Sequence, residues 1–156
     1  MQVWITGNGN DNPGNPQVDD EDVLVCAVLA VDTGTPCAVL WQVPNAPIVF
    51  SSDPSKQGRS EDAAVSWTWR EYMLGNASKS WETPDSVIYY PMARAGTRAL
   101  DTVEQFFKLD SGRTINKFLV AGASKRGAAT WLTGAANPDK VRQPACTPSC
   151  HPHAAY

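Results

Sequence analysis

The sequence has little of several features that would place it in a particular class of proteins. Its longest apolar run lies around Val23–Val31, well short of the roughly 20 residues that a membrane-spanning helix needs. Its formal net charge is −3, so it lacks the basic excess of proteins that bind nucleic acid. Its 42% hydrophobic and 19% charged residues are typical of a globular domain. We therefore expect no transmembrane segment and no nucleic-acid partner.

Cysteine is also scarce. Four cysteines in 156 residues, widely scattered, do not indicate a disulfide framework. Cys26 lies in an apolar helical run and Cys37 begins an apolar strand, so we interpret both as small buried hydrophobic residues. The first ten residues, MQVWITGNGN, lack the basic segment and cleavage site of a signal peptide, and they are typical of a strand inside a domain.

What the sequence does contain is an alternation of strand-like and helix-like segments. The periodicity predicts strands at residues 2–6, 37–44 and 115–122, and helices at residues 23–34, 61–74, 92–108 and 125–133. Strands that alternate with helices favour an α/β fold with a parallel sheet between two layers of helices. We expect residues 1–137 to form this domain with about three strands. Residues 138–156, rich in proline, cysteine and histidine, should form an irregular tail that does not continue the sheet.

Ser124 occupies the turn between a predicted strand and a predicted helix, in the segment Gly122-Ala123-Ser124-Lys125-Arg126-Gly127. In a nucleophile elbow the chain reverses sharply at such a serine, and glycines flank it because no side chain fits there. Gly122 stands in its usual place, whereas Gly127 comes one residue later than in G-x-S-x-G. The alternative is that Ser124 only caps the following helix.

An elbow serine also needs donors for the oxyanion that forms during attack on a carbonyl. The backbone N–H of Lys125 follows the serine, at the positive end of a helix. A second donor usually comes from the loop after an earlier strand, which makes Gly7 or Asn8 the candidate. The alternative for this loop is a simple glycine-rich connection.

Five stretches of the chain together resemble one protein family. They are VWITGNGN, VLWQVPNAPIVF, GRSEDAAVSWTWREYM, PMARAGTRALDTVEQF and VAGASKRGAATWLTGAANP, in this order. They resemble the PhoPQ-activated pathogenicity-related (PqaA-type) family, which includes secreted growth-repressor proteins. The resemblance implies an α/β-hydrolase fold with Ser124 as the nucleophile. Ala128 stands where the family has a tryptophan, and the segment after about Lys140 matches no part of the family.

The rest of a catalytic triad is not evident. A serine hydrolase of this fold has its acid and histidine after the nucleophile in the chain. The acid that follows Ser124, Asp139, is interpreted as a solvated charge at a helix end, and His151 and His153 lie in the tail. We therefore expect a partial hydrolase whose relatives attack ester, amide or peptide carbonyls, and which is inactive alone. The alternative is a non-catalytic secreted or surface protein that binds or signals. The family resemblance also implies a secreted or cell-envelope location.

Three further groups of residues could have functional roles. Cys146, Cys150, His151 and His153 are zinc-ligand types, but their C-x3-C-H-x-H spacing matches no common zinc module, so we expect no metal and no other cofactor. Lys125 and Arg126 could bind an anionic substrate or pair with acidic residues on neighbouring loops. Glu61 and Asp62 are typical of the first turn of a helix, where carboxylates favour the dipole.

Overall fold

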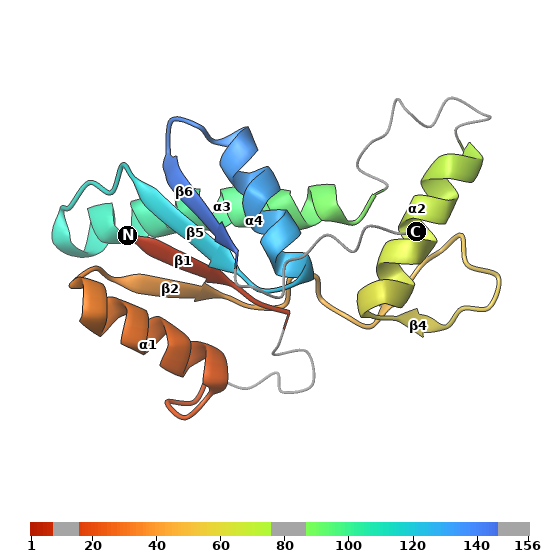
Figure 1. Ribbon diagram of the computed structural model, residues 1–156, viewed down its shortest axis with the longest axis horizontal. Coiled ribbons are helices and arrows are strands. Elements are labelled where there is room, and N and C mark those ends of the chain that lie inside the picture. Colours follow the sequence, from red (N-terminus) through yellow and green to blue (C-terminus); the bar gives the residue numbers. More distant parts are fainter. Residues whose placement is uncertain (8–15, 76–86, 147–156) are drawn as a thin grey trace.

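The computed structural model describes residues 1–7, 16–75 and 87–146. In these residues four parallel strands form a sheet of order β2-β1-β5-β6, made of β1 (Gln2–Ile5), β2 (Cys37–Leu40), β5 (Phe118–Gly122) and β6 (Val141–Cys146). Helix α1 (Glu21–Thr33) covers one face of the sheet, and α3 (Tyr89–Ser111) and α4 (Lys125–Ala136) cover the other (Figure 1). The predicted α/β class with three layers is confirmed.

The order of the strands reverses at the centre of the sheet. Val3 of β1 pairs with Ala38 of β2 on one side and with Val120 of β5 on the other. The β1–α1–β2 crossover and the β5–α4–β6 crossover therefore run in opposite directions across the sheet. Since such crossovers are right-handed, their helices lie on opposite faces. The carboxyl ends of β1 and β5 flank the point of reversal, where open α/β sheets bind their ligands.

The core forms around the two central strands. Val3, Ile5, Phe118 and Val120 are each 1% exposed or less, and Leu100 of α3 is fully buried against them. Burial of each such side chain contributes roughly 1.5–3 kcal/mol. None of the helices in the described residues is long and apolar enough to cross a membrane.

Helix α1 begins two residues before the predicted start and ends at Gly34, as predicted. The Asp20 side chain accepts a hydrogen bond from the backbone N–H of Asp22, and Gly34 ends the helix in the left-handed conformation with φ 61°. The apolar run of this helix is not fully buried, however. Leu24, Val28 and Val31 are at least half exposed, because the sheet covers only one side of α1.

Strand β6 corrects the prediction of an irregular tail. Residues 141–146 pair with β5, so the sheet has four strands instead of three. The Phe118 N–H donates to the Lys140 carbonyl at 2.8 Å, which sets the start of this pairing. The side chain of Lys140 also bonds Asp101 at 2.9 Å and Glu104 at 2.8 Å, both on α3. Pro144 hides the strand from sequence analysis, because proline is rare inside a sheet.

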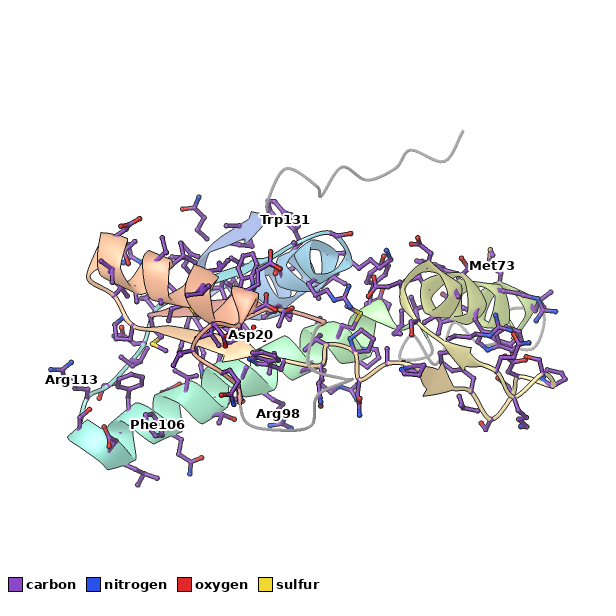
Figure 2. All side chains as sticks on the ribbon, turned by 90° about the horizontal axis from the view of Figure 1, so that it is seen from below. Asp20, Met73, Arg98, Phe106, Arg113 and Trp131 are labelled. Carbon is purple, nitrogen blue, oxygen red and sulfur yellow. A yellow bond between two sulfur atoms is a disulfide. The ribbon has the colours of Figure 1, made fainter. Side chains whose placement is uncertain are left out.

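A side unit follows β2. The segment 45–59 lies between a predicted strand and a predicted helix. It contains a short antiparallel hairpin of β3 (Ile48–Val49) and β4 (Gly58–Arg59), which leads into α2 (Glu61–Gly75). Figure 1 shows these elements beside the sheet. In Figure 2, Met73 of this unit and Arg113 lie at opposite ends of the molecule. We call residues 48–75 the side unit.

Asp53 organises the hairpin of the side unit. Its carboxylate is 1% exposed, accepts a hydrogen bond from Arg59 Nε at 2.6 Å and accepts another from the Ser55 N–H at 2.9 Å. The Arg59 guanidinium in turn lies 4.3 Å from the centre of the Trp67 ring. The hydrogen bond from Arg59, together with those from Ser55, lowers the pKa of Asp53 to about 2, although burial acts in the opposite direction.

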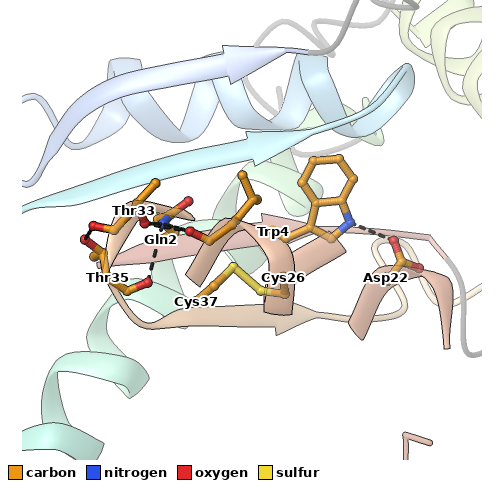
Figure 3. Close-up of a disulfide and its surroundings, with 8 residues drawn as sticks. Gln2, Trp4, Asp22, Cys26, Thr33, Thr35 and Cys37 are labelled. Atoms are coloured by element: carbon orange, nitrogen blue, oxygen red, sulfur yellow. Dashed lines mark hydrogen bonds between the residues drawn. A yellow bond between two sulfur atoms is a disulfide. The ribbon is translucent and has the colours of Figure 1, made fainter. Parts of the chain in front are cut away.

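The interpretation of Cys26 and Cys37 as separate buried thiols is wrong. The two residues form a disulfide with their Cα atoms 5.4 Å apart, and it joins α1 to β2 (Figure 3). The β1–α1–β2 crossover brings the middle of the helix beside the start of the strand. Their separation of 11 residues does not reveal this contact, since it depends on the crossover.

Replacement of both Cys26 and Cys37 by serine should destabilise the fold. Loss of a cross-link that closes a short loop is expected to lower the free energy of unfolding by about 2–3 kcal/mol, because the unfolded chain gains entropy. Urea unfolding of the two proteins measures this difference, and the reduced wild type should behave like the variant. Peptide mapping without reduction gives the direct control. Recovery of both residues as free thiols from the folded protein would contradict the structure.

The lowered pKa of Asp53 predicts a pH dependence of stability. Asp53 stabilises the fold fully above its ordinary pKa of 3.8, and this contribution is lost as the pH falls towards the folded value of about 2. Asp53→Asn should therefore be less stable than the wild type at pH 6, and the difference should shrink between pH 4 and pH 2. Urea unfolding over this pH range measures it, with exposed Asp32→Asn as control. A difference that does not change with pH would refute the assignment.

Candidate functional site

Ser124 lies on a sharp turn between β5 and α4. Its backbone has φ 52° and ψ −122°, one of four positive-φ conformations of non-glycine residues in the described part of the chain. This combination lies outside the regions that L-residues ordinarily occupy. The side chain makes no capping hydrogen bond to α4. The geometry therefore differs from that of an ordinary helix cap and is typical of the strained strand-to-helix turn of an elbow.

Gly122 allows the turn to form. A Cβ atom at this position would lie 3.0 Å from three atoms, namely the carbonyl oxygens of Ile5 and Arg126 and the Thr130 hydroxyl oxygen. The first turn of α4 thus packs directly onto β5 and β1, and a larger residue would push the helix away. Gly127, the later glycine of the motif, is buried within α4.

A cavity of about 300 Å³ opens beside Ser124. It lies at the carboxyl ends of β1 and β5, the point where the strand order reverses. Residues from both turns, from the start of α1 and from the start of α2 line it: Trp4, Ile5, Thr6, Gly7, Glu21, Asp22, Val25, Glu61, Ala123, Ser124 and Arg126.

Two of the residues predicted to supply oxyanion donors lie at the same edge of the sheet as this cavity. Lys125 is the first residue of α4, where backbone N–H groups have no acceptor within the helix and the helix dipole is positive. Gly7 follows β1 and lines the cavity. Asn8 lies outside the described residues. The structure thus brings Ser124 together with Lys125 and Gly7 at one edge of the sheet.

Lys125 and Arg126 pair with acidic residues of the side unit, which is the second of their two predicted alternatives. Arg126 donates to both carboxylate oxygens of Glu61, with Nη1 2.9 Å from Oε2 and Nη2 bonded to Oε1. Lys125 Nζ lies 2.8 Å from Asp62 Oδ1 and 3.3 Å from Glu61 Oε2. Glu61 and Asp62 are therefore more than first-turn helix charges, since they hold α2 at the elbow.

These pairs fix the protonation states around the serine. The hydrogen bond from Arg126 lowers the pKa of Glu61, although partial burial opposes the shift. The hydrogen bond to Asp62 raises the pKa of Lys125. Burial raises the pKa of Tyr89, which lies near the same charges. Lys125 therefore stays protonated at neutral pH and cannot take a proton from Ser124, as a general base would have to do.

Asp22 is a member of the cavity lining that the sequence analysis did not single out. Its carboxylate is buried and accepts a hydrogen bond from Trp4 Nε1 at 2.6 Å (Figure 3). It accepts a second one from the Thr6 hydroxyl at 2.9 Å. Trp4 and Thr6 are two residues apart on one side of a strand, facing α1. Trp4 and Thr6 thus place polar groups at alternate positions of a buried strand. This pattern in the sequence was the signal that the facing helix carries a polar partner.

Other predicted candidates are not brought to Ser124. Asp139 is exposed between α4 and β6, at the opposite end of the strands from the elbow. Cys146 ends β6, whereas Cys150, His151 and His153 lie outside the described residues. Within residues 1–7, 16–75 and 87–146 there is no histidine and no group of three or more potential metal ligands. The described site therefore contains the serine and the residues predicted as its oxyanion donors, without a histidine.

Comparisons with known proteins place this site in a family context. A family model described as PhoPQ-activated pathogenicity-related protein matches residues 2–152. The chain is similar to autocrine proliferation repressor protein A of Dictyostelium discoideum, with 36% identity over 137 residues that cover 87% of the chain and 25% of that protein. It thus spans about a quarter of the length of this relative. No solved structure matches the chain. The family match extends past Lys140, so the expectation that the later segment lies outside the family pattern is wrong.

The backbone conformation of Ser124 predicts an unusual response to substitution. Glycine adopts positive φ without strain, so Ser124→Gly should unfold with a free energy about 1 kcal/mol higher than Ser124→Ala. The matched control is Ser66, exposed in the middle of α2. There the order should reverse, because glycine costs about 1 kcal/mol relative to alanine inside a helix. Urea unfolding measures all four variants, and the same order at both positions would contradict the strained turn.

Proposed function

The chain belongs to the PhoPQ-activated pathogenicity-related protein family, and on that premise we propose that it carries the nucleophile of a serine hydrolase. In this proposal Ser124 attacks an ester, amide or peptide carbonyl. The observation that carries the proposal is the backbone of Ser124, which has positive φ between strand and helix and lies beside a cavity. An ordinary helix cap has no need of such a conformation.

The arrangement of the strands supports the same proposal. In the α/β-hydrolase fold the nucleophile follows a central parallel strand, and the second oxyanion donor comes from the loop after a neighbouring strand. Here Ser124 follows β5, and Gly7 follows β1, which pairs with β5 along its length. The proposal thus rests on the topology as well as on the serine.

The chemistry assigns a role to each part of the site. As Ser124 Oγ bonds to the carbonyl carbon, its proton passes to a base and the carbonyl π electrons move to the oxygen. The backbone N–H groups of Lys125 and Gly7 are the proposed donors to this oxyanion. The tetrahedral intermediate then expels its leaving group, which takes the proton from the base and leaves Ser124 acylated. Because Lys125 is held protonated and the described residues contain no histidine, we propose that the base is a histidine that lies outside them.

A missing base can be supplied from solution, which gives a direct test of the elbow. We expect the chain to react slowly with a fluorophosphonate probe, and added imidazole to accelerate labelling at Ser124, because imidazole replaces the histidine side chain as proton acceptor. Peptide mass spectrometry of the labelled protein identifies the serine that reacts and gives the rate at each imidazole concentration. Robust hydrolysis of p-nitrophenyl esters without imidazole, abolished in Ser124→Ala, would show that the chain already has a base.

Two variants control this experiment. Ser124→Ala should lose the imidazole-dependent labelling. Ser111→Ala removes an exposed serine from the end of α3 and should react like the wild type. Labelling that spreads over exposed serines, or that occurs at the rate of the urea-unfolded chain, would contradict a nucleophilic role for Ser124.

A second candidate function is a secreted, non-catalytic binding or signalling protein. The name of the Dictyostelium relative describes an autocrine proliferation repressor, and the Cys26–Cys37 disulfide favours an oxidising compartment. Ser124→Ala separates the two functions in an assay of cell proliferation with added protein. A binding protein keeps its effect when the hydroxyl is removed, whereas an enzyme loses it.

A further inference from the structure

We propose that Arg126 is a positioning residue of the Ser124 site, whose guanidinium holds the turn after β1 against the elbow and so fixes the place of the Gly7 N–H. The inference rests on the proposed function where it assigns a consequence for the reaction of Ser124. The contacts by which Arg126 positions the turn do not depend on that function.

The guanidinium of Arg126 occupies the space where residue 7 would carry a side chain. A Cβ atom at Gly7 would lie 1.7 Å from Arg126 Nη2 and 2.2 Å from Cζ. Such distances are far inside van der Waals contact, so the guanidinium and the backbone of the turn lie directly against each other. Gly7 does not have a positive φ, so its backbone conformation does not require glycine. Glycine is needed at this position because the guanidinium leaves no space for a side chain.

Hydrogen bonds extend this contact to two other segments of the chain. Arg126 Nε donates to the Val43 carbonyl at 2.8 Å, and the Val43 N–H donates to the Thr6 carbonyl at 3.0 Å. The two Nη atoms bind Glu61 at the start of α2. One side chain of α4 thereby links the turn after β1, the loop after β2 and the side unit.

The chemistry of these contacts favours a positioning role of Arg126 over direct binding of an anionic substrate. Arg126 is 11% exposed, and the Glu61 carboxylate balances its charge through two parallel hydrogen bonds. A bidentate pair of this kind fixes the orientation of the guanidinium as well as balancing its charge. A lysine cannot reproduce the two coplanar N–H donors of the guanidinium. Glu61 adopts φ 48° at the pair, so the start of α2 is itself strained.

The consequence for the reaction should be a loss of rate without a loss of affinity. The Gly7 N–H is proposed to act on the oxyanion, which exists only in the transition state, and a donor misplaced by 1 Å acts mainly on the rate. Arg126→Lys, which keeps the charge and loses the fork, should lower the maximal rate of imidazole-dependent phosphonylation at Ser124 about tenfold or more. The probe concentration that gives half of this rate should stay unchanged.

Chemical rescue distinguishes positioning from general structural damage. Methylguanidinium at millimolar concentration should restore much of the rate of Arg126→Ala, because it fills the vacated site, and it should leave the rate of the wild type unchanged. Arg70→Lys is the matched control, an exposed arginine of α2 whose ion pair with Glu71 lies on the surface. An Arg126→Lys variant that reacts at the wild-type rate, or a change confined to the half-saturating probe concentration, would overturn the proposal.

A second measurement does not depend on the reactivity of Ser124. Gly7→Ala should lower the equilibrium constant for folding about tenfold or more in the wild type, because the added methyl group overlaps the guanidinium. In the Arg126→Ala background the same change should have little effect, since the space is empty. Additive effects would show that the guanidinium does not hold the turn, and would overturn the inference. If Ser124 never reacts in the wild type while this coupling is present, the proposed function fails and the contact stands.

Discussion

The close approach of α4 to the two central strands determines the conformation of Ser124 and the position of its neighbours at the carboxyl edge of the sheet. Gly122 lacks a Cβ atom, which leaves room beside it for the Arg126 carbonyl in the first turn of α4 and for the Ile5 carbonyl of β1. The chain must then reverse between β5 and α4 within a residue or two, and Ser124 absorbs this reversal with a positive φ. The same approach carries Arg126 onto the turn after β1. The strained serine and the position of its neighbours are thus two results of one packing contact.

The turn at Ser124 also brings together parts of the chain that are distant in sequence. Residues 7, 43, 61 and 126 meet through a single side chain, and Lys125 adds a second ion pair to the start of α2. The side unit lies beside the sheet, yet its first helical residues are bonded to the turn that carries Ser124. The location of the site at the reversal of strand order follows from the right-handed crossovers, which open the crevice between β1 and β5.

Sequence patterns within single segments predicted most of the fold. Contacts between distant segments could not be predicted from such patterns. The apolar runs of β1 and β5, and the start of α4 after a glycine turn, predicted the central sheet and the place of Ser124. Strand β6 escaped prediction because Pro144 and the polar residues before it break the alternation typical of strands. The Cys26–Cys37 disulfide escaped because connectivity depends on the crossover and is not encoded in spacing. The acidic partners of Arg126 were one of two alternatives, and only the three-dimensional arrangement distinguishes them.

The central claim is that Ser124 lies on a strained turn, which distinguishes it from a helix cap and supports the proposal that it is a nucleophile. The backbone torsion angle of Ser124 in a high-resolution crystal structure of the chain tests this claim most directly. The account predicts a φ near 52°, with the hydroxyl directed away from the first N–H groups of α4. A negative φ, with the Ser124 hydroxyl oxygen accepting a hydrogen bond from the N–H of Arg126 or Gly127, would contradict it.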